Sequence, residues 1–233
     1  MQSKNFGFLL FRKLIKDNDL FIKVLLKDDK LISGIVYGGN SSKKNNIYQL
    51  GYYLTLNLKR KNLNNPYIIE AEIDTPLIGS IINDKYKLYC LLSIVSIINL
   101  SIIEGQTVKG LFVCINDFIN ILIKKKNWIK FYCLWLFSLL KVIGYEIDYK
   151  SNSEKLFYDL EFQEFLSIKR KNSLKFPHAY LTQNSIIDYT YLDTVFIIFE
   201  YIFKNNHLNN SNYKLPDNYI NFKKLILEYN FNN

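Results

Sequence analysis

The spacing of hydrophobic residues changes near Pro76, and this change limits the folds that the chain can adopt. Before it, short apolar runs at residues 8–11, 20–25, 31–37, 52–58 and 67–73 alternate with polar turns. Apolar runs of this length between turn residues are typical of β-strands. Five strands at hairpin spacing predict a small barrel in residues 6–80, and the OB-fold is a barrel of five strands.

After Pro76 the apolar residues recur with a helical period. Helices are predicted over residues 85–103, 109–124 and 128–143, the last ended by Gly144. Their wide apolar faces should pack on each other and on the barrel. Farther on, residues 155–160 and 164–168 predict a hairpin, and residues 188–203 and 218–229 predict helices.

The predicted fold class is therefore α+β, with two domains. An N-terminal five-stranded OB-fold barrel occupies residues 1–80. A helical bundle domain occupies residues 81–233 and includes a small C-terminal β-hairpin and helical part at about residues 151–180. With 49% hydrophobic and 16% aromatic residues, the 233-residue chain can bury a core of that size.

Charge and targeting signals favour a cytoplasmic protein. The formal net charge is +9, but Lys, Asn, Ile, Tyr and Phe all have AT-rich codons, so the charge indicates a nucleic-acid partner only where it is clustered. The N-terminus does not resemble a signal peptide. Residues 88–103 form the longest uncharged run, which contains Ser and Asn and is shorter than the ~20 residues of a membrane span. We expect a buried helix there and no membrane association.

The cysteines argue against a structural metal or a disulfide framework. Cys90, Cys114 and Cys133 lie far apart in apolar surroundings and form no CxxC pair. Such residues are expected to be buried, inert thiols in a reducing compartment. No bound metal and no cofactor is predicted.

Enzyme motifs are scarce. The two histidines, His178 and His207, lie in polar segments where we expect exposed side chains, and neither forms a nucleophile-and-base pattern. Glu70, Glu72 and Asp74 leave one alternative open, because carboxylates can hold Mg²⁺ in a nuclease. They are more typical of solvated positions on a strand, and the overall prediction is a protein without catalytic residues.

Basic residues occur at the ends and turns of three predicted strand segments. In a small barrel such loops can converge at the rim, where they could follow a phosphate backbone. Aromatic residues that could stack on bases lie nearby in the sequence. The alternative is a solvated barrel whose lysines only maintain solubility. The predicted DNA-binding residues are Arg12, Lys13, Lys43, Lys44, Lys59, Arg60 and Lys61, and the neighbouring aromatics are Phe11, Tyr37, Tyr48, Tyr52 and Tyr53.

A further basic run joins two predicted helices. Lys124, Lys125, Lys126 and Lys130 can complement helix dipoles. The alternative interpretation is that this basic junction, beside an apolar groove, holds an acidic peptide tail.

The order of these segments resembles the RecO family of bacterial recombination mediators over residues 6–205. Residues 6–12, 19–25 and 30–39 are similar to the family's first three strands, and residues 49–58 to its fourth. Residues 103–105 resemble a family helix end, and residues 135–145 resemble a helix that ends in Gly-Tyr. The glycine-containing basic loop at residues 38–44 is most similar to alphaproteobacterial members.

The resemblance implies an activity without catalysis. It implies binding of single- and double-stranded DNA, annealing of complementary strands, and loading of RecA onto DNA coated by single-strand-binding protein, in the cytoplasm at the nucleoid. It implies two protein partners, the acidic C-terminal tail of single-strand-binding protein and RecR. A tail that ends in apolar residues needs a hydrophobic cleft with a basic rim, for which we predict Trp128, Lys130, Phe131 and Lys141.

The chain departs from the family pattern at three places. Members that bind zinc carry cysteines after the glycine-tyrosine turn, whereas this chain has Ser151 near the first such place and no cysteine beyond Cys133. Leu136 stands where many members have Glu. Asn40, Asn45 and Asn46 occupy loop positions that could carry Arg, which predicts weaker DNA binding. The alternatives to a mediator are the metal-dependent nuclease and a protein-interaction module that does not bind DNA.

Overall fold

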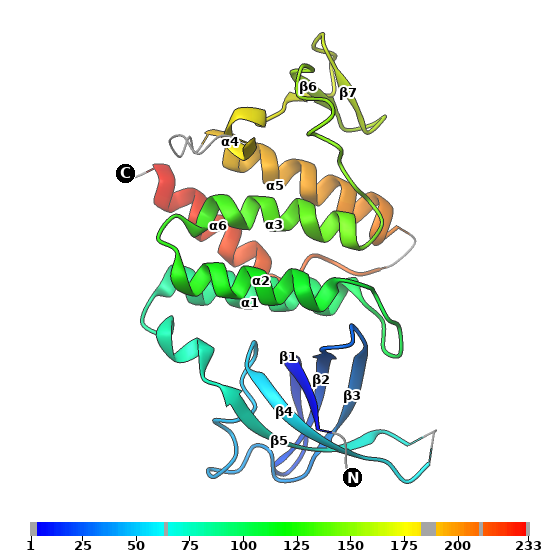
Figure 1. Cartoon of the computed structure of the whole chain (residues 1–233), viewed down its shortest axis with the longest axis vertical. Helices are drawn as coiled ribbons and strands as arrows, with labels where there is room; N and C mark the ends of the chain where they lie inside the picture. The colour runs from blue at the N-terminus through cyan, green and yellow to red at the C-terminus, as the bar shows by residue number, and fades with distance from the viewer. Residues whose placement is uncertain (1–3, 63–64, 183–189, 210–211, 232–233) are drawn as a thin grey trace. The chain divides into compact units, whose positions relative to one another are not determined.

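The N-terminal part of the chain is a closed barrel of five strands. The structure is a computed structural model that describes residues 4–62, 65–182, 190–209 and 212–231. The strands are β1 (Asn5–Lys16), β2 (Asp19–Leu26), β3 (Leu31–Val36), β4 (Tyr53–Lys59) and β5 (Tyr67–Thr75). They close in the order β1-β2-β3-β5-β4, with β3 and β5 parallel and the other neighbours antiparallel (Figure 1). The predicted barrel is confirmed.

Alternation along the strands fills the barrel with aliphatic side chains. Leu9, Ile22, Val24, Leu54 and Ile69 are among its buried core residues, and the polar residues between them face outward. The parallel seam between β3 and β5 depends on a glycine. A Cβ atom at Gly34 would lie 2.5 Å from the carbonyl oxygen of Tyr67, so a larger residue would push the two strands apart.

Three long helices follow the barrel. A short 3₁₀ helix, η1 (Leu77–Ser80), leads into α1 (Lys85–Ser101), which Asp84 caps by accepting a hydrogen bond from the Lys87 amide. Next come α2 (Leu111–Lys124) and α3 (Trp128–Val142), which ends before Gly144 at a φ of 96°. All three predicted helices are confirmed to within two residues.

Packing and hydrogen bonds join the first helices to the barrel. Helix α1 packs against β1 as predicted. The carboxylate of Asp29, in the turn between β2 and β3, accepts hydrogen bonds of 2.8 Å from the amides of Gly110 and Phe112. These amides open α2 and would otherwise have no partner within the helix, so the β2–β3 turn caps α2.

A small sheet and three further helices complete the chain. The predicted hairpin is present as β6 (Phe157–Asp159) and β7 (Glu164–Leu166), but a third strand, β8 (Ser173–Lys175), extends it in the order β7-β6-β8. The sequence did not predict β8, because Ser173–Lys175 lies in a polar stretch without the apolar run that marks the hairpin strands. The helices of the described C-terminal part are α4 (His178–Thr182), α5 (Thr190–Ile202) and α6 (Asp217–Phe231), with a short π-helix η2 (Phe203–His207) after α5. Part of the predicted 188–203 helix, residues 188–189, lies outside the described residues.

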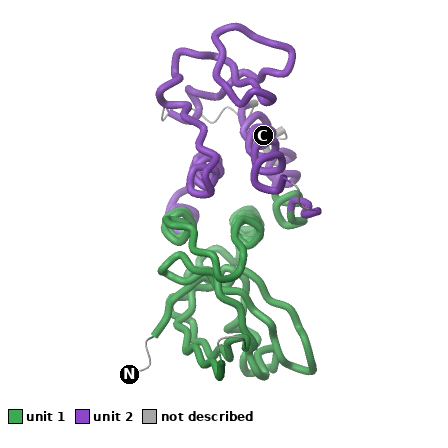
Figure 2. Tube along the Cα trace, turned by 90° about the vertical axis from the view of Figure 1, so that its right-hand side faces the viewer, with its two compact units in different colours: residues 1–119, 216–222 green, residues 120–215, 223–233 purple. Residues whose placement is uncertain are grey.

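The chain divides into two compact units. One comprises Met1–Ile119 and Pro216–Phe222, and the other Asn120–Leu215 and Lys223–Asn233 (Figure 2). The sequence predicts two domains that meet near residue 80. Domains are parts that fold independently, which is a different property from compactness, so this boundary stays a prediction. Among the described residues, no helix combines the length and apolar character needed to cross a membrane.

Two expectations about exposure are wrong. Cys114 is half-buried on α2 rather than buried, whereas Cys90 and Cys133 are buried as expected. His178 and His207 are half-buried rather than exposed, because the rings of Phe176 and Phe203 pack against them.

Candidate nucleic-acid interface

The connection between β3 and β4, residues 37–52, is the basic loop of the barrel. It begins with Gly38 at a φ of 63°, a left-handed conformation that glycine adopts without strain. The Gly38 amide donates a 2.7 Å hydrogen bond to the carboxylate of Asp19 on β2, and the Ser41 hydroxyl donates to the Gly38 carbonyl. The Asn40 amide donates to the carbonyl of Asn18 in the β1–β2 turn. The loop is therefore tied to the ends of β1 and β2.

Arg12 adds a second tie from β1. Its guanidinium donates a 2.7 Å hydrogen bond to the carbonyl of Tyr48 and a 3.1 Å bond to the side-chain oxygen of Asn40. The side chain is half-buried, so these charge-assisted bonds are stronger than they would be in open solvent. The structure thus brings Arg12 to the basic loop, as predicted, but directs its guanidinium at the loop backbone.

The lysines of the basic loop remain accessible. Lys43 and Lys44 are exposed, as is Lys13 on β1. The Lys44 ammonium lies 3.4 Å from the Tyr37 carbonyl oxygen, and a single carbonyl leaves its other protons available. Arg12, Lys43 and Lys44 therefore lie together at the basic loop, and Lys13 is the next residue to Arg12 on β1.

Most of the aromatic residues near this loop are not available for stacking. Tyr48 is only 2% exposed, and its hydroxyl accepts a 3.1 Å hydrogen bond from the Ala71 amide on β5. Burial raises the pKa of this phenol above its ordinary value. Phe11, Tyr52 and Tyr53 are half-buried, whereas the Tyr37 side chain is 56% exposed. Sequence proximity did not distinguish the core ring of Tyr48 from the exposed ring of Tyr37.

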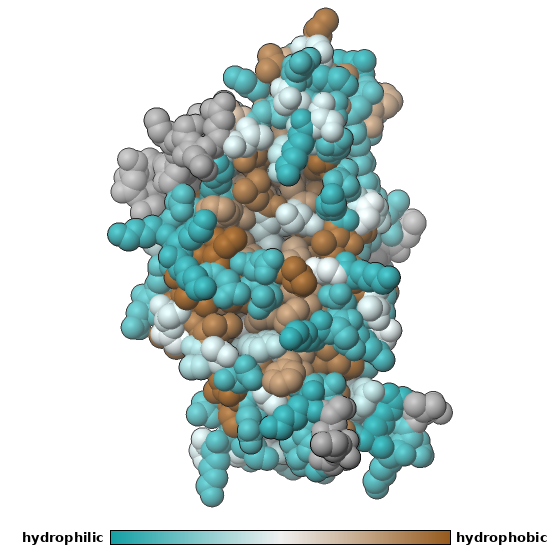
Figure 3. All heavy atoms as spheres, viewed as in Figure 1, coloured by the Kyte–Doolittle hydropathy of each residue, from teal (hydrophilic) through white to brown (hydrophobic). Residues whose placement is uncertain are grey.

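The third predicted basic segment lies apart from the loop. Figure 1 shows the β4–β5 hairpin extending to the lower right and the basic loop at the lower left. The coloured residues at the lower right of Figure 3 are mostly hydrophilic. Lys59 forms a 3.1 Å salt bridge with Glu70 across the hairpin. Arg60 donates to the Asn62 carbonyl and lies 4.9 Å from the centre of the Tyr67 ring. Lys61 is exposed. The predicted single patch is thus divided into two groups.

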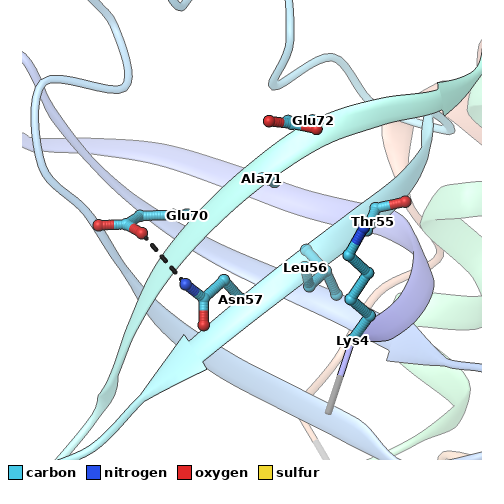
Figure 4. Close-up of a pocket in the computed structure, with 7 residues that line it drawn as sticks. All are labelled: Lys4, Thr55, Leu56, Asn57, Glu70, Ala71 and Glu72. Atoms are coloured by element: carbon cyan, nitrogen blue, oxygen red, sulfur yellow. Dashed lines mark hydrogen bonds between the residues drawn. The ribbon is translucent and has the colours of Figure 1, made fainter. Parts of the chain in front are cut away.

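A shallow groove of about 320 Å³ lies on the outer face of β4 and β5 (Figure 4). Lys4, Thr55, Asn57, Glu70 and Glu72 contribute polar groups to it. The Glu70 side chain extends toward Asn57, whose amide donates to it at 3.3 Å.

The carboxylates near this groove are poorly placed for a shared metal. Glu70, Glu72 and Asp74 occupy alternate positions of one strand, which are about 7 Å apart. Glu70 is bound to Lys59, and Asp74 accepts hydrogen bonds from Thr55 and Thr75. Within the described ranges, no group of three His, Cys, Asp or Glu side chains could hold a metal ion. The geometry therefore offers the nuclease alternative no support.

The residues predicted to bind a partner tail lie on two faces of α3. Trp128 is only 5% exposed, and the half-buried Phe131 has the Lys125 ammonium 4.2 Å from its ring centre. Lys130 and Lys141 are eleven positions apart, which places them within about 20° of the same helix face and about 16 Å apart along the axis. Trp128 points to the opposite side of that helix and belongs to the core.

A groove of about 160 Å³ lies beside Lys141. Leu134 and Phe137 line it from the α3 face that also carries Lys130, and Ile147 and Tyr149 line it from the segment after α3. Lys141 donates a 2.6 Å hydrogen bond to Glu146, and this bond raises the pKa of the ammonium. Sequence reasoning missed residues 146–150, because nothing in their pattern indicates that they fold back on the helix.

The buried thiol of this region is chemically inert. Burial raises the pKa of Cys133 to about 12, so the thiol stays protonated at neutral pH. Cys114 is half-buried and more accessible.

The chain is similar in sequence to curated proteins from the genus Rickettsia. A protein named DNA repair protein RecO from Rickettsia canadensis is 28% identical over 148 residues, covering 64% of this chain and 61% of the relative. One of the same name from Rickettsia bellii is 29% identical over 153 residues, again covering 64% and 61%. An uncharacterised protein from Rickettsia prowazekii is 33% identical over 99 residues, or 42% of this chain and 84% of that protein.

These matches cover part of each protein. The chain spans about 61% of the length of the two proteins named RecO. No protein-family model matches it. The layout of a five-stranded barrel, helices and a small C-terminal sheet agrees with the layout that the sequence resemblance implied.

Proposed function

Since the chain belongs to the RecO family of DNA repair proteins, we propose that it binds DNA through its barrel and acts as a mediator of recombinational repair without catalysing a reaction. The observation that carries this proposal is the basic loop, which holds Lys43 and Lys44 exposed at a barrel edge and is fixed there by Arg12 and Asp19. Cations on an ordered backbone are suited to phosphate contacts.

The DNA contacts form a principal and an auxiliary group. Lys13, Lys43 and Lys44 make the principal phosphate contacts, and Arg12 supports them from beneath the loop. Lys59, Arg60 and Lys61 are auxiliary, because two of these side chains already have partners on their own hairpin. Binding that rests on phosphate contacts is tolerant of sequence, as a protein acting at any damaged site requires.

The mediator role involves two protein partners. We propose that the chain helps to load RecA onto DNA coated by single-strand-binding protein, anneals complementary strands, and acts with RecR at the bacterial nucleoid. The groove beside Lys141 is the proposed site for the acidic tail of single-strand-binding protein, because it combines the apolar side chains of Leu134 and Phe137 with Lys141 and Lys150. Glu146 and Asp148 also line it, so the tail would have to displace Glu146 from Lys141. Lys130 adds a cation farther along α3.

Incubation of the purified chain with end-labelled single-stranded DNA and Mg²⁺ tests the DNA-binding proposal. An intact, shifted complex is expected. Shortened DNA that persists in a Glu70→Gln, Glu72→Gln variant would indicate a contaminating nuclease, and shortening that this variant abolishes would establish the nuclease alternative. The absence of any complex at low salt would leave only a protein-interaction module.

Titration with a fluorescent peptide that copies the acidic tail tests the partner site. We expect binding of micromolar strength, as a small interface gives, and a loss of about ten-fold when Lys130 and Lys141 are both changed to Glu. Lys171→Glu is the matched control, because Lys171 is exposed and does not line the groove. A wild-type chain that does not bind the peptide would remove this partner from the proposal.

A further inference from the structure

Tyr37 presents an exposed aromatic ring at the start of the basic loop. Among the described residues of β1–β5 and their connections, it carries the only exposed aromatic side chain, at 56%. Single exposed apolar residues are common on protein surfaces and need no explanation by themselves. The surroundings of Tyr37 distinguish it from such a residue.

The backbone that carries the ring is fixed on both sides. Val36, the preceding residue, is buried at the end of β3, where it pairs with Leu20. The following amide, that of Gly38, is held by Asp19 at 2.7 Å. A ring on a fixed backbone loses little conformational freedom when it binds a ligand, which lowers the entropic cost of binding.

Lysines lie near the backbone that carries the ring. The Lys44 ammonium lies 3.4 Å from the Tyr37 carbonyl, and Lys43 is its exposed neighbour in the loop. Another lysine, Lys16, lies two strands away from Tyr37. Lys16 on β1 pairs with Asp19 on β2. The next β2 residue, Leu20, pairs with Val36 on β3, directly before Tyr37. The negative charge of Asp19 is engaged by the Gly38 amide. An exposed ring with lysines on the same loop matches the chemistry of a nucleotide, which has a flat base and an adjacent phosphate.

We propose that Tyr37 stacks on an unpaired base of the DNA strand whose phosphates contact Lys43 and Lys44. This inference rests on the proposed function and adds strand selectivity to it. Phosphate contacts alone do not distinguish a single strand from a duplex. A base within a duplex has both faces covered by its neighbours and must be unstacked before a side chain can reach one. Tyr37 therefore makes the loop selective for unpaired DNA.

Three DNA ligands of equal length separate stacking from phosphate binding: a single strand with bases, a single strand whose central positions are abasic, and a duplex. Affinities are measured for the wild type, Tyr37→Ala and Tyr37→Phe. We expect Tyr37→Ala to weaken binding of the base-bearing strand by about five-fold or more. Its affinities for the abasic strand and the duplex should stay within about two-fold of wild type, because their contacts are with phosphates. Tyr37→Phe should retain wild-type affinity for all three.

Tyr213→Ala is the matched control, since this ring is 71% exposed, adjoins Lys214 and lies in the other compact unit. A single 2-aminopurine in the bound strand gives a second readout, because its fluorescence falls on stacking and should recover in Tyr37→Ala. Equal losses on all three ligands, or no loss on the base-bearing strand, would overturn the inference while leaving DNA binding intact. A wild-type chain that binds none of the ligands would overturn the proposed function itself.

Discussion

The basic loop and the β4–β5 hairpin belong to the same barrel and each carries a run of basic residues, yet their side chains are used differently. Lys43 and Lys44 have no carboxylate partner in any described ion pair. On the hairpin, Lys59 is paired with Glu70, and Arg60 packs on Tyr67. Residues that look equivalent in the sequence therefore differ in the charge that they can offer a ligand.

The difference arises from the residues across the strands. Outward positions of β5 carry Glu70, Glu72 and Asp74, so carboxylates lie beside the cation on β4. Glu70 pairs directly with Asn57, and Lys59, two residues farther along β4, reaches Glu70 diagonally. The basic loop has no facing strand, and the carboxylate of Asp19 accepts a hydrogen bond from its Gly38 amide. Net charge is therefore less informative about DNA binding than the arrangement of charges on each surface.

The largest effect is expected from the loop lysines. Changing Lys43 and Lys44 together to Ala should weaken binding of single-stranded DNA by about ten-fold at moderate salt, because two phosphate contacts are lost. The slope of log affinity against log salt should become shallower by roughly one to two. Lys214→Ala with Lys224→Ala controls for the loss of two exposed charges elsewhere. An unchanged slope would show that the loop does not contact DNA.

A smaller loss of DNA affinity is expected for Arg12→Lys. Lysine keeps the positive charge but cannot form both hydrogen bonds, to the Tyr48 carbonyl and to the Asn40 side chain. The loop should become less ordered, with faster amide hydrogen exchange over residues 38–48 and DNA binding weakened by about three- to five-fold. The salt slope should not change. Lys16→Arg is the control at a nearby exposed position.

Coupling between the two sites sharpens this test. If Arg12 acts by positioning the loop, Arg12→Lys should have little further effect in the Lys43→Ala, Lys44→Ala background. Losses that add fully would instead mean that Arg12 contacts DNA by itself.

The hairpin cations should contribute less than the loop lysines. We expect the triple variant Lys59→Ala, Arg60→Ala, Lys61→Ala to weaken DNA binding by about two- to three-fold, because Lys59 and Arg60 are already engaged. The measurement is the same titration, with thermal unfolding to confirm that the barrel remains folded. A loss as large as that of the loop variant would contradict the distinction between the two regions.

The smallest expected effect is an increase in the affinity for DNA. Glu72→Gln removes one exposed negative charge from the hairpin face without disturbing the Lys59–Glu70 pair. Binding of DNA at low salt should strengthen by about two-fold, since long-range repulsion is reduced. The gain should vanish near 1 M salt, where screening acts over about 3 Å. A gain that persists at high salt would indicate a direct contact instead.

Local patterns in the sequence predicted the elements but not the contacts between distant residues. Five strands and three long helices followed from apolar spacing, because each buries one regular face. The bond between Arg12 and Tyr48 joins residues 36 positions apart, and no local pattern encodes it. For the same reason, burial of the Tyr48 ring became visible only in the structure.

The parallel seam between β3 and β5 has a consequence for how the barrel opens. It comprises two residue pairs, Gly34 with Tyr67 and Ile35 with Ile68, whereas the antiparallel neighbours pair over four or more. The β3–β5 pairing is therefore the shortest in the barrel, and partial unfolding should begin there while the antiparallel pairing of β1, β2 and β3 persists. Tyr67 belongs to this short pairing and also contacts Arg60 of the β4–β5 hairpin. A ligand that binds the folded hairpin would therefore slow the opening of the whole barrel.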